Sequence, residues 1–140
     1  MNIDGLRDAL TSRKILKAGS LQQVDIEQVL EGRDEKEFED AWLAAFDALK
    51  SLTLSNDKQR QVDEIREAAF KAVYDATGSD ELAGYVSDDF DVIARAALND
   101  EDQCFAGAML DDYLRALIPG GKRVPTSSSL ADGLKKLQSP

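Results

Sequence analysis

The chain has 140 residues, of which 43% are hydrophobic and 31% charged, a composition typical of one globular domain with a sizeable core. Its 27 acidic and 17 basic residues give a net charge of −10, which disfavours direct binding of nucleic acid or of an anionic membrane. Because histidine is absent and Cys104 is the only cysteine, Ser–His and Cys–His catalysis, histidine-ligated zinc and an internal disulfide are all excluded.

The N-terminal stretch MNIDGLRDALTSRKIL contains an early acid and no long apolar run, unlike a signal peptide. Nowhere does the chain approach the roughly 18 consecutive apolar residues that a membrane-spanning helix requires. We therefore expect a cytoplasmic protein that does not bind membranes.

The first two predicted elements are short. Helical spacing of Ile3, Leu6 and Leu10 predicts a helix near the N-terminus. In SLQQVDIEQVLEG, a capping box that begins at Ser20 and a stop at Gly32 favour a second helix. The alternation of Val24 and Ile26 in the same stretch also fits a strand, but the chain offers no second strand-like run to pair with it.

Two longer helices follow. From Asp34 to about Leu52, apolar residues recur at steps of three or four, among them Trp42 and Phe46, which we expect to pack in the core. The next helix begins at Ser55 or Asn56 and ends at Gly78, because a serine or asparagine cap precedes its apolar repeat and a glycine follows it.

The stretch from Ser79 to Pro119 combines an apolar helical repeat with ten acidic residues and only two arginines. Ser79 is predicted to cap a helix of one or two turns that ends at Tyr85, and Ser87 to cap a second one. Asp100 starts a third capping box. That last helix carries an apolar stripe from Phe105 to Leu117, and we expect Cys104 beside it to be a small buried residue rather than a nucleophile. The chain is thus predicted to be all-α, a single-domain bundle of five or six helices.

Composition changes after Gly121. Residues 1–121 form the predicted acidic helical domain, whereas residues 122–140 are basic and rich in serine and proline. One interpretation of this second segment is a mobile tail. The alternative is a short helix, formed through Leu130, Leu134 and Leu137, that folds back on the acidic body or on a partner.

Metal-dependent hydrolysis is the enzymatic alternative, because carboxylates are the only abundant functional groups. Glu64 and Glu67 lie three residues apart on one helix face, and Asp88 and Asp91 form a second such pair. These pairs resemble those of the all-α nucleotide pyrophosphohydrolases, whose carboxylates hold magnesium. The resemblance is incomplete, since aspartates replace glutamates in the second pair and no lysine-rich substrate pocket is evident. Our main prediction is therefore no catalytic residue, no metal and no cofactor.

A partner-binding surface is the main functional hypothesis. Helix capping explains many of the acids in the Ser79–Pro119 stretch, but not Asp91, nor Asp111 and Asp112 in the middle of a helix, where the dipole does not favour them. We predict a partner-binding face made of acids for electrostatic attraction and of tyrosines for contact: Asp88, Asp89, Asp91, Asp111, Asp112, Tyr85 and Tyr113.

The run TGSDELAGYVSDDFDVIARAAL, from Thr77 to Leu98, together with the later LRALIPG, resembles a family of small acidic helical bacterial proteins. Some of these proteins are uncharacterised and others are immunity proteins of toxin systems. The resemblance implies a non-enzymatic protein-binding module that inhibits a basic partner such as a toxin nuclease, its carboxylates standing in for phosphates. A homodimer without another partner is a further alternative.

Overall fold

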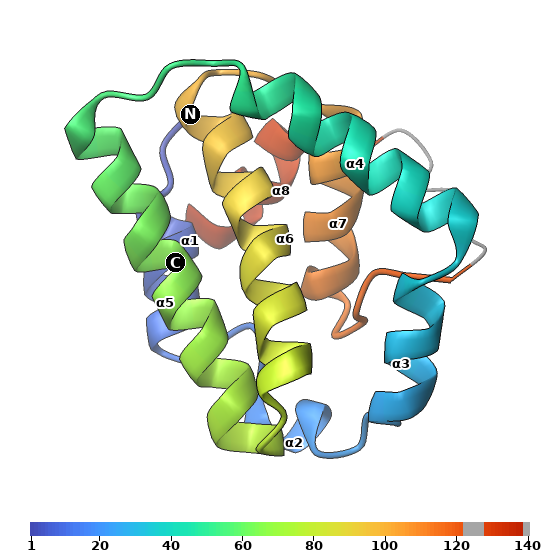
Figure 1. Ribbon diagram of the computed structural model, residues 1–140. Coiled ribbons are helices and arrows are strands. Elements are labelled where there is room, and N and C mark those ends of the chain that lie inside the picture. Colours follow the sequence, from blue (N-terminus) through green and yellow to red (C-terminus); the bar gives the residue numbers. More distant parts are fainter. Residues whose placement is uncertain (122–127, 139–140) are drawn as a thin grey trace.

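The structure is a computed structural model that describes residues 1–121 and 128–138. Over these residues the chain forms eight helices and no strand (Figure 1). The all-α prediction is therefore confirmed, although five or six helices undercount the eight found. In chain order the helices are α1 (Asp4–Thr11), α2 (Ala18–Leu21), α3 (Ile26–Arg33), α4 (Lys36–Lys50), α5 (Asn56–Thr77), α6 (Asp80–Leu98), α7 (Cys104–Leu114) and α8 (Leu130–Gln138).

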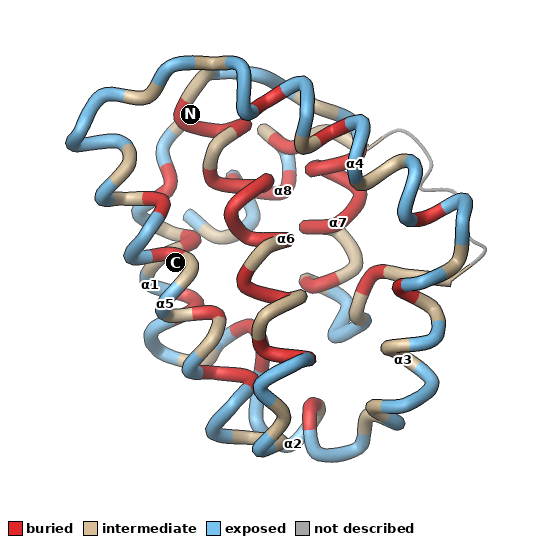
Figure 2. Tube along the Cα trace, in the orientation of Figure 1, coloured by how far each residue is buried: buried red, intermediate tan, exposed pale blue. Residues whose placement is uncertain are grey.

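Helix α6 lies at the centre of the bundle. It packs along α5 on one side and against α7 on the other, and it also contacts α4 and α8 (Figure 1). Figure 2 shows buried positions along most of its length. Phe90 and Ile93 are fully enclosed, and the buried Phe90 ring packs against Tyr113 of α7 with 4.7 Å between ring centroids. A helix that is apolar on several faces needs such neighbours on all sides, because each exposed apolar face would cost free energy.

The boundaries of α5 follow from local chemistry. The Ser55 hydroxyl accepts a hydrogen bond from the backbone N–H of Lys58 at 3.2 Å, which satisfies one of the free donors at the helix start. Gly78 follows the last residue with φ of +70°, the left-handed conformation that glycine adopts without a steric penalty. Both predicted ends of this helix are confirmed.

The two helices predicted on either side of Ser87 are one continuous helix, so the prediction of a break there is wrong. Ser79 caps α6 by accepting a hydrogen bond from the N–H of Leu82 at 3.1 Å. Ser87 is buried mid-helix, and its hydroxyl donates to the backbone carbonyl of Arg66 on α5 at 3.1 Å. A serine is accommodated inside a helix when its hydroxyl finds such a partner.

The predicted start of the second helix is also wrong. Asp25 rather than Ser20 caps α3, accepting a hydrogen bond from the N–H of Gln28 at 3.2 Å. Ser20 instead lies in the single turn of α2, and Gly32 lies within the last turn of α3. The chain therefore makes two short helices where one was predicted.

Helix α7 departs from its prediction at both ends. Its cap is Gln103, whose side chain accepts a hydrogen bond from the N–H of Ala106 at 2.7 Å, whereas Asp100 forms an ion pair with the N-terminal amine. Cys104 is exposed at the first position of the helix, so the expectation that it is buried is wrong. The helix ends at Leu114, which leaves Leu117 outside the apolar stripe and 45% exposed.

Helix α8 lies against α1 and α7, with Leu130 and Leu134 buried. Asp102 receives hydrogen bonds from the N–H of Leu130 at 2.7 Å and from the hydroxyl of Ser129 at 3.1 Å. A Cβ atom on Gly107 of α7 would lie 2.1 Å from the carbonyl oxygen of Ser128, so only glycine permits this approach. The rest of the predicted tail, residues 122–127 and 139–140, lies outside the described residues.

Candidate functional site

A fully buried carboxylate joins four helices of the bundle. Asp89 on α6 accepts hydrogen bonds from both terminal nitrogens of Arg33, at 2.7 and 2.5 Å. It also accepts one from the indole N–H of Trp42 at 2.9 Å and one from the hydroxyl of Tyr113 at 2.5 Å. Arg33 donates further to the carbonyl of Pro119 at 3.0 Å. We call Arg33, Trp42, Asp89 and Tyr113 the Asp89 network.

The electrostatics of the Asp89 network keep its donors protonated. Burial alone would lower the pKa of Arg33, but the facing Asp89 carboxylate outweighs this effect and raises it. Burial and the same carboxylate raise the pKa of the Tyr113 hydroxyl well above its ordinary value. Among the described residues, every buried side-chain nitrogen and oxygen has a hydrogen-bond partner. The Asp89 network is therefore a satisfied internal structure that fixes α3, α4 and α7 on α6.

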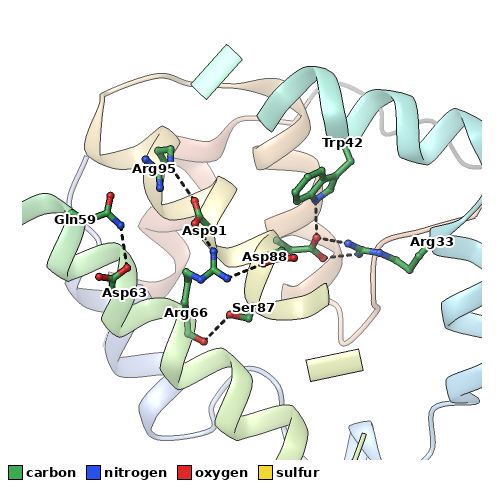
Figure 3. A network of polar contacts seen from close by, with 10 residues as sticks. Arg33, Trp42, Gln59, Asp63, Arg66, Ser87, Asp88, Asp91 and Arg95 are labelled. Atoms are coloured by element: carbon green, nitrogen blue, oxygen red, sulfur yellow. Dashed lines mark hydrogen bonds and ion pairs between the residues drawn. The ribbon is translucent and has the colours of Figure 1, made fainter. Parts of the chain in front are cut away.

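A second cluster of charges fixes α5 on α6. Arg66 donates to Asp88 at 2.9 Å and to Asp91 at 2.7 Å, and Arg95 donates to the other oxygen of Asp91 at 3.0 Å. Figure 3 shows the Arg66 guanidinium between the two carboxylates. Burial and the neighbouring carboxylates Asp89 and Asp91 raise the pKa of Asp88, although Arg66 acts in the opposite direction.

The structure does not assemble the alternative magnesium site made of Glu64, Glu67, Asp88 and Asp91. No group of three or more acidic, histidine or cysteine side chains is placed to hold a metal in residues 1–121 and 128–138. Glu67 instead pairs with Lys71 at 2.8 Å. The guanidinium of Arg66 already occupies the position between the two aspartates that a cation would need.

The predicted partner-binding face does not form as one surface, because three of its members are internal. Asp89, Asp91 and Tyr113 are 0%, 5% and 3% exposed, and each is held by the ion pairs and hydrogen bonds described above. The expectation that these three side chains are displayed outward is therefore wrong. Burial of two charges among arginines, rather than helix capping, accounts for the clustered aspartates of α6.

The other four members remain accessible, in two places. Tyr85 and Asp88 are half-buried on α6 and line a common groove. Asp111 and Asp112 are half-buried on α7, where Asp111 pairs with Arg115 at 3.0 Å. Neither α7 aspartate lines the groove.

This groove, which we call the α4–α6 groove, has a volume of about 280 Å³, and two members of the Asp89 network, Arg33 and Trp42, line it. Its lining residues come from the end of α3 and the turn that follows it, from α4 and from α6. Arg33 lies at its base, with its guanidinium carbon 4.6 Å from the ring centroid of Phe38 and 5.4 Å from that of Tyr85. The lining residues are Arg33, Asp34, Phe38, Glu39, Trp42, Leu43, Tyr85 and Asp88.

Sequence reasoning missed most of the groove. Trp42 falls on the apolar stripe of α4, whose spacing predicts a core position, and Phe38 lies four residues before it on the same stripe. A buried indole N–H nevertheless needs an acceptor, and this requirement was a signal that a polar group lies beneath Trp42. Arg33 gave no comparable signal, because one basic residue in an acidic stretch is typical of any exposed helix.

Comparisons with known proteins identify the family. The model of a family described as Immunity protein PIM1 matches residues 5–120, which include all of α2 to α7 and every member of the Asp89 network. No curated protein matches the chain. None of the helices in the described residues is both long and apolar enough to cross a bilayer. Because the match covers most of the chain, the protein belongs to the PIM1 immunity protein family.

Proposed function

We propose that this chain is a non-enzymatic immunity protein that neutralises a cognate toxin by binding it directly. The match to the immunity protein family over residues 5–120 is the observation that carries the proposal. The fold supports it, because a well-packed helical bundle presents a rigid surface and little binding energy is lost in ordering it.

The proposed partner is basic. A net charge of −10 favours encounter with a positively charged protein and accelerates association, especially at low ionic strength. Of the predicted contact residues, we retain the four accessible ones. Tyr85 and Asp88 would contact the toxin in the α4–α6 groove, and Asp111 and Asp112 would add negative charge on α7.

Co-expression tests this proposal. A toxin encoded beside the gene of this chain should arrest growth when expressed alone and should be tolerated when the chain is co-expressed. The purified proteins should form a stable complex whose association rate falls as salt rises from 50 to 500 mM, roughly as electrostatic screening predicts. If the toxin arrests growth equally with and without the chain, and no complex forms at low salt, the proposal is refuted.

The proposal that the protein is not a metal-dependent enzyme has a separate test. Calorimetric titration with Mg²⁺ or Mn²⁺ should show no specific binding at millimolar metal, because Arg66 already pairs with both Asp88 and Asp91 and Arg95 pairs with Asp91. Saturable binding of one equivalent of either metal would contradict this expectation.

A further inference from the structure

We infer that the α4–α6 groove is a receptor for a single basic side chain of the partner, with the geometry and charge suited to arginine. The inference rests on the proposed function and specifies its contact chemistry. The groove has three relevant parts: aromatic side chains along its wall, carboxylates at its rim, and Arg33 at its base, whose positive charge Asp89 already neutralises.

The aromatic wall is the first part of the argument. Phe38, Trp42 and Tyr85 line the groove. Trp42 and Tyr85 are half-buried and offer ring surface to a ligand, whereas Phe38 is 3% exposed and its ring already faces Arg33. Leu43 beside them is 45% exposed and adds apolar surface. A planar guanidinium stacks on such rings, while its aliphatic stem covers apolar surface. Arg33 already makes this type of contact from inside the groove, over Phe38 and Tyr85.

The rim supplies the charge. Asp34 and Glu39 are exposed at the mouth of the groove, and neither forms an ion pair with any residue in the described parts of the chain. Asp88 faces the same space but shares its charge with Arg66 at 2.9 Å. The rim therefore carries two carboxylates without a counterion and a third that is only partly compensated.

The base of the groove does not cancel this charge. Arg33 is the only basic residue that lines the groove among the described residues, and its side chain is 4% exposed and bidentate with Asp89. The two charges neutralise each other, so an entering cation meets a net negative field. Among cationic side chains, arginine suits this groove best, because its five N–H donors can bind two carboxylates while its planar guanidinium stacks on an aromatic ring.

A matched pair of double variants tests the charge requirement. Asp34→Asn with Glu39→Gln removes the two unpaired rim charges, and Glu31→Gln with Glu37→Gln removes two exposed charges from α3 and α4 that do not line the groove. Both change the net charge equally and leave the Asp89 network intact. Toxin affinity should fall at least about tenfold for the rim variant and less than about threefold for the control. Equal losses in the two variants would overturn the inference and leave the proposed function standing.

A second measurement does not depend on the toxin. Trp42 is the only tryptophan of the chain, so its fluorescence reports on the groove alone. The capped tripeptide acetyl-Gly-Arg-Gly-amide should change this fluorescence saturably in the millimolar range, whereas the peptide with neutral citrulline in place of arginine should not. The rim variant should weaken the arginine response, and the control variant should retain it. Identical responses to the two peptides, or no response to either, would overturn the inference even if the toxin binds.

Discussion

Arg33 at the end of α3 and Asp89 in the middle of α6 form a bidentate ion pair whose side chains are only 4% and 0% exposed. The two residues are 56 positions apart in the chain, and Trp42 and Tyr113 complete the coordination of the carboxylate. A buried ion pair of this kind contributes modestly when intact, but removing one partner is costly because the other charge is left without compensation.

Asp89→Asn should therefore destabilise the protein strongly. The amide keeps the shape of the carboxylate but leaves the Arg33 charge buried and uncompensated, at a cost of about 3 to 5 kcal/mol in the free energy of unfolding. Urea denaturation followed by circular dichroism measures this loss. Asp47→Asn, at an exposed position on α4, is the control and should change stability by less than about 0.5 kcal/mol. Similar losses in both variants would mean that the ion pair is not formed in solution.

Tyr113→Phe removes one hydrogen bond to Asp89 and should cost about 1 to 3 kcal/mol at pH 7. This difference in stability between the wild type and the variant should shrink as the pH rises above 10, because the folded and unfolded chains bind the Tyr113 proton with different affinities. Burial raises the pKa of folded Tyr113 well above 10.0, so the unfolded chain loses this proton first and the wild type loses stability with rising pH. Phenylalanine has no such proton. Urea titrations of both proteins between pH 7 and 11 give the difference, and a constant difference would contradict the raised pKa.

Asp88→Asn tests the opposite end of the pH scale. Burial raises the pKa of folded Asp88 above 3.8, so the folded protein binds this proton more tightly than the unfolded chain does. This tighter binding of the Asp88 proton stabilises the folded protein fully below pH 3.8, and the stabilisation is lost as the pH rises through the pKa of folded Asp88. The stability of the wild type relative to Asp88→Asn should therefore fall between pH 3 and 7. An increase over that range would show that Arg66, rather than burial, dominates the titration of this carboxyl.

Gly107→Ala should destabilise the contact between α7 and the segment before α8. The new methyl group would lie 2.1 Å from the carbonyl oxygen of Ser128, a backbone atom that cannot rotate away, and we expect a loss of about 1 to 3 kcal/mol. Gly84→Ala on α6 is the matched control, since its methyl group meets nothing within 4 Å. That substitution should stabilise the helix by up to about 1 kcal/mol. Thermal denaturation of both variants checks the pair, and equal melting temperatures would refute the close approach.

The helical class and several boundaries could be predicted from local chemistry alone. Ser55 and Gly78 delimit α5 because a cap and a left-handed glycine act on atoms within a few residues. The prediction of a helix start at Ser87 is wrong because it considered only residues close in sequence. The residue type of Ser87 favours a cap, but a hydrogen bond to Arg66 on another helix satisfies it inside α6. The resemblance of the Thr77–Leu98 run to immunity proteins agrees with the family match.

The sequence alone did not predict which acidic side chains are buried and which meet solvent. Asp88 and Asp89 are adjacent and Asp91 lies two positions further on, so at about 100° per residue Asp89 leaves the helix axis in a different direction from the other two. Which of them meets solvent depends on what surrounds α6, and their partners Arg33 and Arg66 lie 56 and 22 to 25 residues away. Composition, cap chemistry and apolar periodicity therefore determined an acidic, all-helical bundle. Only the packing of α3, α4, α5 and α7 on α6 decided that Asp89 and Asp91 became internal ion pairs. The same packing left Asp34 and Glu39 on the lining of a groove, without an ion pair to any described residue. The reason is that burial and ion pairing depend on distances between helices, which residues remote in sequence set together.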